Sequence, residues 1–284
     1  MKYCLIIFSI FNSYFIIVSS KKIDSVWPVD DSIPFPYPTP DPINIIPSRA
    51  EYIRTPKPLT IEANFALLSY VTNTGSSLIV TAKRSMLSTI ATGGVLYNDS
   101  YIFFQREFFW DSSLKHSSGA TINGYGTPLQ TVISFYNRKY GTLENAKSKR
   151  DGIFQVVVFI RVGPIPNPLF YPFELVTQAV KKANSTILIP EILTYDFYLL
   201  PSLRQDYYAY PGEYFDHESG NTYFSSTVTL WRRFPPPFIS YDQFKATFGS
   251  FLDKSGKPYS HVVSRYPRGY RPLKHVILSG IALV

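Results

Sequence analysis

Residues 101–110 read YIFFQREFFW, and residues 130–137 read QTVISFYN. Both stretches are rich in aromatic and β-branched residues, which suit the pleated surface of a sheet. We therefore predict a strand over each of them. Further strands are predicted at 77–81, 154–162, 197–200, 228–232 and 276–283. Turn residues punctuate the chain between them at 92–94, 123–126 and 151–152.

Helical patterns are few and short. Residues 173–183 carry apolar residues at helical spacing, and residues 240–248 begin with Ser240 as an N-cap and Gln243 three positions later, as in a capping box. The chain has 284 residues, 45% of them hydrophobic, which is enough for one large domain with its own core. We predict a β-dominated α+β fold in which the helices are peripheral.

The N-terminal region differs from the rest of the chain. Residues 1–20 have Lys2 at the start, a short apolar run and two small serines, which is typical of a secretory signal peptide. The alternative, a membrane anchor, would need about 20 apolar residues. Residues 21–42 form a leader whose proline density excludes helix and central strand. We predict a secreted, extracellular protein with its domain at 43–284 and no membrane span in the mature chain.

Cysteine usage narrows the chemistry. The only cysteine, Cys4, lies in the predicted signal, so a disulfide framework, cysteine catalysis and cysteine-bound metal are all excluded from the mature chain. Asn98 and Asn184 each begin an N-glycosylation pattern and are candidate modification sites.

The chain is basic, with a formal net charge of +8. Such a balance favours acidic partners such as sulfated glycans, whereas a secreted chain has no reason to meet nucleic acid. The basic residues are scattered in small groups, and such a distribution is also typical of an ordinary solvent-exposed surface that binds no particular partner. The candidate anion-binding groups are Lys181 with Lys182 and Arg232 with Arg233.

A succession of short motifs runs from about residue 27 to the end. It includes Pro42-Ile43-Asn44-Ile45, Asn73-Thr74-Gly75-Ser76, Gly93-Gly94-Val95-Leu96, Asn123-Gly124, Asp151-Gly152-Ile153, Tyr210-Pro211-Gly212, Ser240-Tyr241-Asp242-Gln243-Phe244 and Arg271-Pro272-Leu273. In this order and spacing the motifs resemble those of the alpha-class carbonic anhydrases. The resemblance implies a large, mostly antiparallel, twisted central sheet of about ten strands with short helices outside it.

The resemblance also locates the zinc site of that family. Active members present His-x-His on one strand and a third histidine on the next, since residues i and i+2 of a strand share a face. The bound zinc lowers the pKa of its water to about 7. In this chain the resemblance assigns the three positions to Glu107, Phe109 and Val132. Phenylalanine and valine cannot coordinate metal, so we predict no zinc, no other cofactor and a pocket filled with apolar bulk.

The supporting positions of the family site are also replaced. The resemblance places Gln130 where a carboxylate orients the third histidine, Ser76 where the proton shuttle lies, and Gly119 where a second carboxylate lies. A longer loop at 212–223 replaces the family's substrate-site loop. Its threonine pair corresponds to Asn221 and Thr222 in one alignment and to Phe215 and Asp216 in the other. These positions make up a predicted vestigial pocket: Ser76, Glu107, Phe109, Gln130, Val132, Asn221 and Thr222.

Relocated chemistry is the alternative. Asp216-His217-Glu218 is the one compact ligand-like cluster in the sequence. One interpretation is a metal or acid–base site; the interpretation that we prefer is a polar surface loop. Glu107 in the old pocket could serve as a general acid. The four histidines are His116, His217, His261 and His275, and none of them pairs with another at i+2.

The sequence therefore predicts a secreted carbonic anhydrase-related protein that is catalytically inactive. We expect it to be an extracellular binding module for an unidentified extracellular protein or anionic glycan. Two alternatives stay open: a metal-dependent hydratase or esterase with relocated ligands, and an anionic glycan-binding surface protein.

Overall fold

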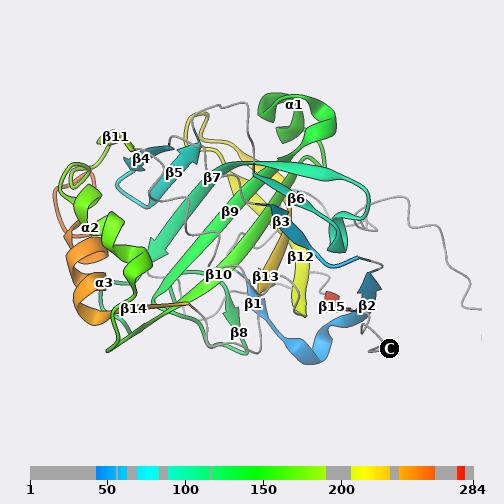
Figure 1. Cartoon of the computed structure of the whole chain (residues 1–284), viewed down its shortest axis with the longest axis horizontal. Helices are drawn as coiled ribbons and strands as arrows, with labels where there is room; N and C mark the ends of the chain where they lie inside the picture. The colour runs from blue at the N-terminus through cyan, green and yellow to red at the C-terminus, as the bar shows by residue number, and fades with distance from the viewer. Residues whose placement is uncertain are drawn as a thin grey trace, which may run out of the picture.

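A computed structural model describes residues 43–55, 57–62, 69–82, 89–115, 117–189, 206–230, 237–259 and 274–278 (Figure 1). The predicted signal peptide, the leader and the predicted strand at 197–200 lie outside these residues. Across the described ranges, none of the helices has the length and apolar character that a membrane crossing requires.

One large sheet dominates the fold. Its main path contains β2 (Glu51–Thr55), β4 (Ser69–Asn73), β5 (Leu78–Ala82), β7 (Ser100–Trp110), β9 (Leu129–Asn137), β10 (Ile153–Gly163), β11 (Thr186–Ile189), β12 (Tyr207–Phe215), β13 (Thr222–Leu230) and β15 (Lys274–Leu278). Their order is β11-β4-β5-β7-β9-β10-β13-β12-β15-β2. Along this path only β10–β13 and β15–β2 are parallel pairs. The predicted mostly antiparallel sheet is confirmed.

Smaller elements surround the main path. They are the strands β3 (Thr60–Glu62), β6 (Ile90–Thr92) and β14 (Phe238–Ser240), the separate pair β1 (Asn44–Ile45) and β8 (Thr121–Ile122), the helices α1 (Leu143–Lys147), α2 (Tyr171–Thr177) and α3 (Tyr241–Thr247), and 3-10 turns at Pro47–Arg49, Gly94–Leu96, Arg138–Tyr140, Pro168–Phe170 and Phe248–Ser250. In Figure 1, α2 and α3 lie together at one end of the sheet and α1 lies apart from them. The peripheral position of the helices is confirmed.

The helix boundaries show where local patterns succeed and fail. Ser240 caps α3 as predicted: its hydroxyl accepts from the Gln243 backbone N–H at 3.1 Å, and the Gln243 side chain accepts from the Ser240 N–H at 3.3 Å. The predicted helix at 173–183 is wrong at both ends, because α2 spans Tyr171–Thr177. Beyond Thr177 the chain continues in turns, and Asn184, with φ 63, turns it into β11.

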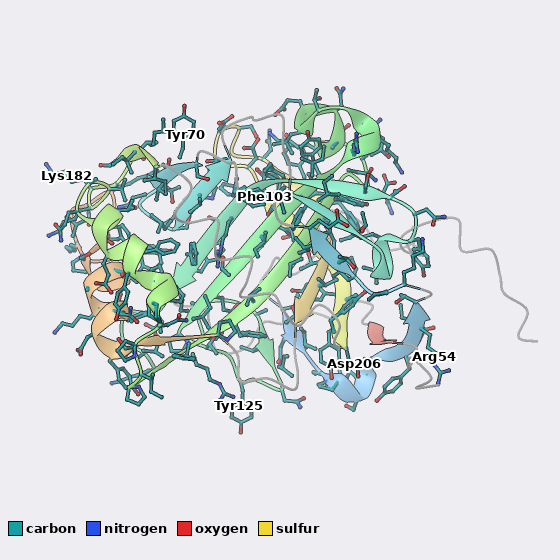
Figure 2. All side chains as sticks on the ribbon, viewed as in Figure 1. Arg54, Tyr70, Phe103, Tyr125, Lys182 and Asp206 are labelled. Atoms are coloured by element: carbon teal, nitrogen blue, oxygen red, sulfur yellow. The ribbon has the colours of Figure 1, made fainter. Side chains whose placement is uncertain are left out.

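Strand β7 separates two different environments. Phe108 and Trp110 point to one face, where they are fully buried against aromatic side chains of α2, α3 and the segment after α3. A second cluster, which includes Phe103, packs further along the sheet (Figure 2). Residues on the other face of β7 line the pocket described next.

Candidate functional site

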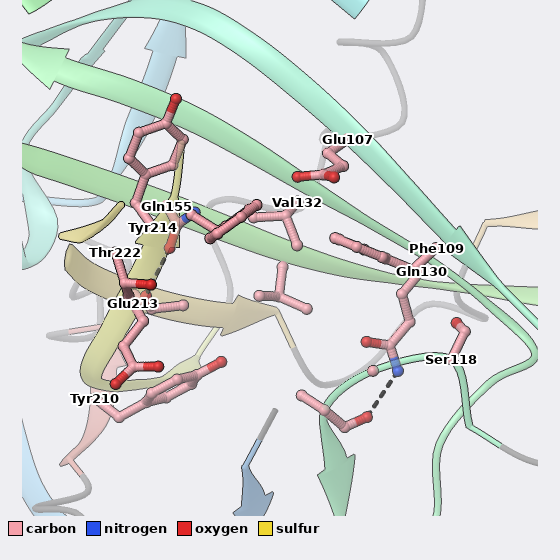
Figure 3. A pocket seen from close by; sticks show the side chains of 15 residues that line it. Glu107, Phe109, Ser118, Gln130, Val132, Gln155, Tyr210, Glu213, Tyr214 and Thr222 are labelled. Atoms are coloured by element: carbon pink, nitrogen blue, oxygen red, sulfur yellow. Dashed lines mark hydrogen bonds between the residues drawn. The ribbon is translucent and has the colours of Figure 1, made fainter. Parts of the chain in front are cut away.

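The register between β7 and β9 places the assigned zinc positions on one face of the sheet. Glu107 lies opposite Val132, and Phe109 lies opposite Gln130. All four side chains line a pocket of about 310 Å³ (Figure 3). The strand alternation therefore brings these residues together just as the i and i+2 spacing predicts.

The pocket is not filled, which corrects the expectation from Phe109 and Val132. Both side chains are half-buried wall residues. Tyr210, Tyr214 and Phe215 of β12 also line the pocket. A volume of about 310 Å³ remains between side chains of β7, β9 and β12.

Glu107 and His217 meet at this pocket. The Nε2 atom of His217 lies 2.8 Å from Oε1 of Glu107, although the two residues are 110 positions apart. Glu107 is 8% exposed, and the His217 side chain is 25% exposed. Burial disfavours the charged imidazole, but the hydrogen bond and charge of Glu107 outweigh that effect and raise the pKa of His217.

A buried ion pair holds the turn that carries His217. The Lys147 ammonium of α1 lies 2.8 Å from Oδ2 of Asp216, and both side chains are 6% exposed. Ser219 donates to the same Asp216 oxygen at 2.7 Å. Burial alone would raise the pKa of Asp216, but hydrogen bonds from Lys147 and Ser219 more than offset this and lower it.

The interpretation of residues 216–218 as a polar surface loop is therefore wrong for two of the three. Asp216 is buried, and His217 reaches back to Glu107. Only Glu218 is exposed as expected. Sequence spacing could not show this, because the turn joins β12 to β13 and its partners come from β7 and α1.

Gln130 and Gly119 form a coupled pair on the pocket wall. The Gln130 amide donates to the Ala120 carbonyl at 2.7 Å and to the Ser117 hydroxyl at 3.0 Å. A Cβ atom at position 119 would lie 2.2 Å from Oε1 of Gln130. The Gln130 amide thus occupies the space that a side chain at position 119 would need.

Of the other three predicted pocket residues, one lines the pocket and two do not. Thr222 lines the pocket. Ser76 is exposed on the turn between β4 and β5, where its hydroxyl lies 3.1 Å from that of Thr74, and Asn221 is exposed on the turn before β13. Neither is among the residues that line the pocket. Gln155 and Tyr214, which the sequence did not single out, do line it, and the alternation of their strands is the one signal that could have indicated them.

Zinc does not fit the donors present. Glu107 and Glu213 are the carboxylates among the described lining residues, and Glu107 is bound to His217. Within the described ranges, no three His, Cys, Asp or Glu side chains are grouped so as to hold a metal ion. His116 and His261 lie outside those ranges, and His275 lies on β15 opposite Tyr208.

The surface candidates lie away from the pocket residues. Asn98 and Asn184 are both exposed in turns. Lys181 and Lys182 are exposed in the turn before β11, and Lys182 projects outward at that end of the molecule (Figure 2). Arg232 and Arg233 lie outside the described residues.

The chain is similar to carbonic anhydrases. The family model described as eukaryotic-type carbonic anhydrase matches residues 39–215. Carbonic anhydrase 7 of Homo sapiens is 32% identical to this chain over 175 residues, which are 60% of this chain and 63% of that relative. The chain thus aligns with a little under two thirds of the length of that relative.

Proposed function

The chain belongs to the eukaryotic-type carbonic anhydrase family, and we propose that it is a member that acts by binding rather than by zinc-dependent hydration. The observation that carries this proposal is the chemistry of the pocket wall. Two of the three assigned ligand positions hold Phe109 and Val132, which have no donor atoms. The third holds Glu107, whose carboxylate is bound to His217. Within the described residues no group of three His, Cys, Asp or Glu side chains could hold a metal ion, whereas zinc sites use three or four protein ligands.

The zinc content of the purified protein tests the proposal. We expect close to zero zinc per chain after dialysis against buffer with trace zinc, measured by elemental analysis, and no CO₂ hydration above the buffer rate. The matched control is the triple variant Glu107→His/Phe109→His/Val132→His, which places three imidazoles on the same face and should take up zinc. About one zinc per wild-type chain would overturn the proposal.

The same experiment decides the enzyme alternative. A hydratase or esterase with relocated ligands requires zinc in the wild-type protein, and if His217 is one of those ligands the His217→Ala variant should lose it. If zinc is present and unchanged in that variant, the ligands must come from elsewhere in the chain.

We further propose that the protein is secreted and works outside the cell. Support comes from residues 1–20 and from the exposure of both sequons at Asn98 and Asn184. Expression of the full chain in animal cells should give a product in the medium that begins near residue 21. Treatment with an N-glycosidase should reduce its mass, and the Asn98→Gln/Asn184→Gln variant should show no reduction.

A second candidate function is binding of an anionic glycan. The Leu252 N–H donates to the Lys181 carbonyl at 2.9 Å, which joins the turn that carries Lys181 and Lys182 to the turn that carries Lys254 and Lys257. All four lysines are exposed. Retention on heparin should fall steeply with salt, and it should fall in Lys181→Ser/Lys182→Ser but not in Lys149→Ser/Lys245→Ser. Equal retention of the two variants would count against this function.

A further inference from the structure

The charged side chains on the described part of the pocket wall are opposite in sign to the net charge of the whole protein. The chain carries a formal net charge of +8. Among the described residues that line the pocket, the charged side chains are nevertheless two carboxylates, Glu107 and Glu213. A ligand that brings a negative group would meet repulsion there, whereas a positive group would meet attraction.

The walls suit an organic cation rather than a bare metal ion. Phe109, Tyr210, Tyr214 and Phe215 all line the pocket, and aromatic ring faces attract ammonium groups within about 6 Å. The volume of about 310 Å³ lies at the lower end of the range for small-molecule sites. The pocket therefore has room for an apolar body as well as a charged head.

Glu107 offers the anchoring group. Its side chain is 10% exposed, and within the described residues the one hydrogen bond of its carboxylate joins Oε1 to His217. A carboxylate has two oxygens and accepts several hydrogen bonds. Oε2 is therefore available to a ligand ammonium, which carries three donors.

We infer that this pocket binds a small primary amine with an apolar or aromatic body, its ammonium on Glu107 and its body against the aromatic wall. The inference rests on the proposed function, because a zinc ion in the pocket would compete for the same carboxylate. It adds the class of ligand to a proposal that otherwise specifies only binding.

His217 acts as a resident competitor of the ligand. Its imidazole already occupies Oε1 of Glu107 and approaches Phe215 edge-on, with ring centroids 4.9 Å apart. Removal of the imidazole leaves the carboxylate without its internal partner. The His217→Ala variant is therefore expected to bind the amine more tightly, which a site built on His217 as a ligand contact would not do.

Benzylamine, benzyl alcohol and benzoate are matched probes that differ in head-group charge. Isothermal titration calorimetry at neutral pH and low salt should give benzylamine a Kd of roughly 0.1–1 mM, as expected for a ligand of this size. Benzyl alcohol should bind about tenfold more weakly, and benzoate should bind more weakly still. If the alcohol or benzoate binds as tightly as the amine, the inference is wrong.

Three variants locate the site. Glu107→Gln keeps the shape and should weaken benzylamine about tenfold. Glu218→Gln makes the same charge change at an exposed position of the turn and should change Kd by less than about twofold. His217→Ala should strengthen binding severalfold. An unchanged Kd in Glu107→Gln, or weaker binding in His217→Ala, would overturn the inference, provided that near-UV circular dichroism shows both variants folded.

The zinc measurement separates this inference from the proposed function. A zinc-free protein that binds no benzylamine contradicts the amine site alone. A protein that holds about one zinc per chain contradicts the proposed function, whatever the amine titration gives.

Discussion

The two faces of β7 contrast within a single strand. Phe108 and Trp110 are fully buried on one face, whereas Glu107 and Phe109 border an open pocket on the other. Successive residues of a strand point to opposite sides, so neighbours in sequence belong to different environments. Side chains on one face stabilise the domain by burial, whereas those on the other face border the candidate functional site.

The packed face is aromatic and closed. The ring centroids of Phe108 and Phe173 lie 5.2 Å apart. The Arg106 guanidinium carbon lies 4.5 Å from the centroid of the Phe108 ring. Trp110 packs against Phe248 and Phe251 and donates to the Tyr259 carbonyl at 3.1 Å. On the pocket face the polar contacts are few and specific. The side chains packed around Phe108 and Trp110 are therefore a different set from those that line the pocket.

The largest expected difference between the two faces of β7 is the loss of unfolding free energy when a side chain on each face is truncated. Trp110→Ala is expected to lower the free energy of unfolding by about 3–5 kcal/mol, because it leaves a cavity in a closed core. Phe109→Ala, on the open wall, should cost only about 1 kcal/mol. Urea denaturation of both variants measures the difference, and equal losses would refute the division of labour between the faces.

The next largest effect on stability is expected from the buried Lys147–Asp216 pair, which holds the turn that carries His217. Lys147→Met leaves the Asp216 carboxylate buried without its partner and should cost about 3 kcal/mol of unfolding free energy. The exposed neighbour Lys149→Met should change it by less than about 0.5 kcal/mol. In the double variant Lys147→Met/Asp216→Asn part of the loss should return, and strict additivity of the two changes would argue against direct coupling.

A smaller effect is expected from the wall pair. Gly119→Ala forces the Gln130 amide away from the Ala120 carbonyl and should cost about 2 kcal/mol. In a Gln130→Ala background the same change at position 119 should cost less than about 1 kcal/mol, since the obstructing amide is gone. Thermal or urea unfolding of the four proteins completes the cycle.

The smallest effect is the pH dependence of stability on the pocket face. The pKa of His217 is raised in the folded protein, so the stabilisation from Glu107 is complete below the unfolded value of about 6.5 and is lost as pH rises through the higher folded value. The partly exposed pair should contribute at most about 1 kcal/mol. Asp216 and Lys254 also act on this imidazole, and both remain in the control.

That control is Glu107→Gln, measured by urea denaturation at about pH 6 and pH 9. The difference in unfolding free energy between the two pH values should be smaller in the variant than in the wild type. An identical pH dependence would show that the His217–Glu107 contact contributes nothing to stability.

Much of the fold could be predicted from local patterns. The strands over 101–110 and 130–137 follow from aromatic and β-branched content, and the start of α3 follows from Ser240 and Gln243. The helix at 173–183 failed at its ends because helical spacing alone does not mark where tertiary packing ends a helix. Within one strand, the i and i+2 spacing sufficed to place Glu107 and Phe109 together.

The sequence by itself determined the fold class, the family and the residue types at the assigned zinc positions, because these depend on composition, motif order and strand periodicity. Only the tertiary structure decided that the pocket stays open and that His217 meets Glu107. Those outcomes depend on the Phe215–Thr222 register of the β12–β13 hairpin and on the Lys147–Asp216 pair. Lys147 and Asp216 lie 69 positions apart in the sequence, and Glu107 and His217 lie 110 positions apart. Contacts over such separations produce no periodic pattern in the sequence of a single chain.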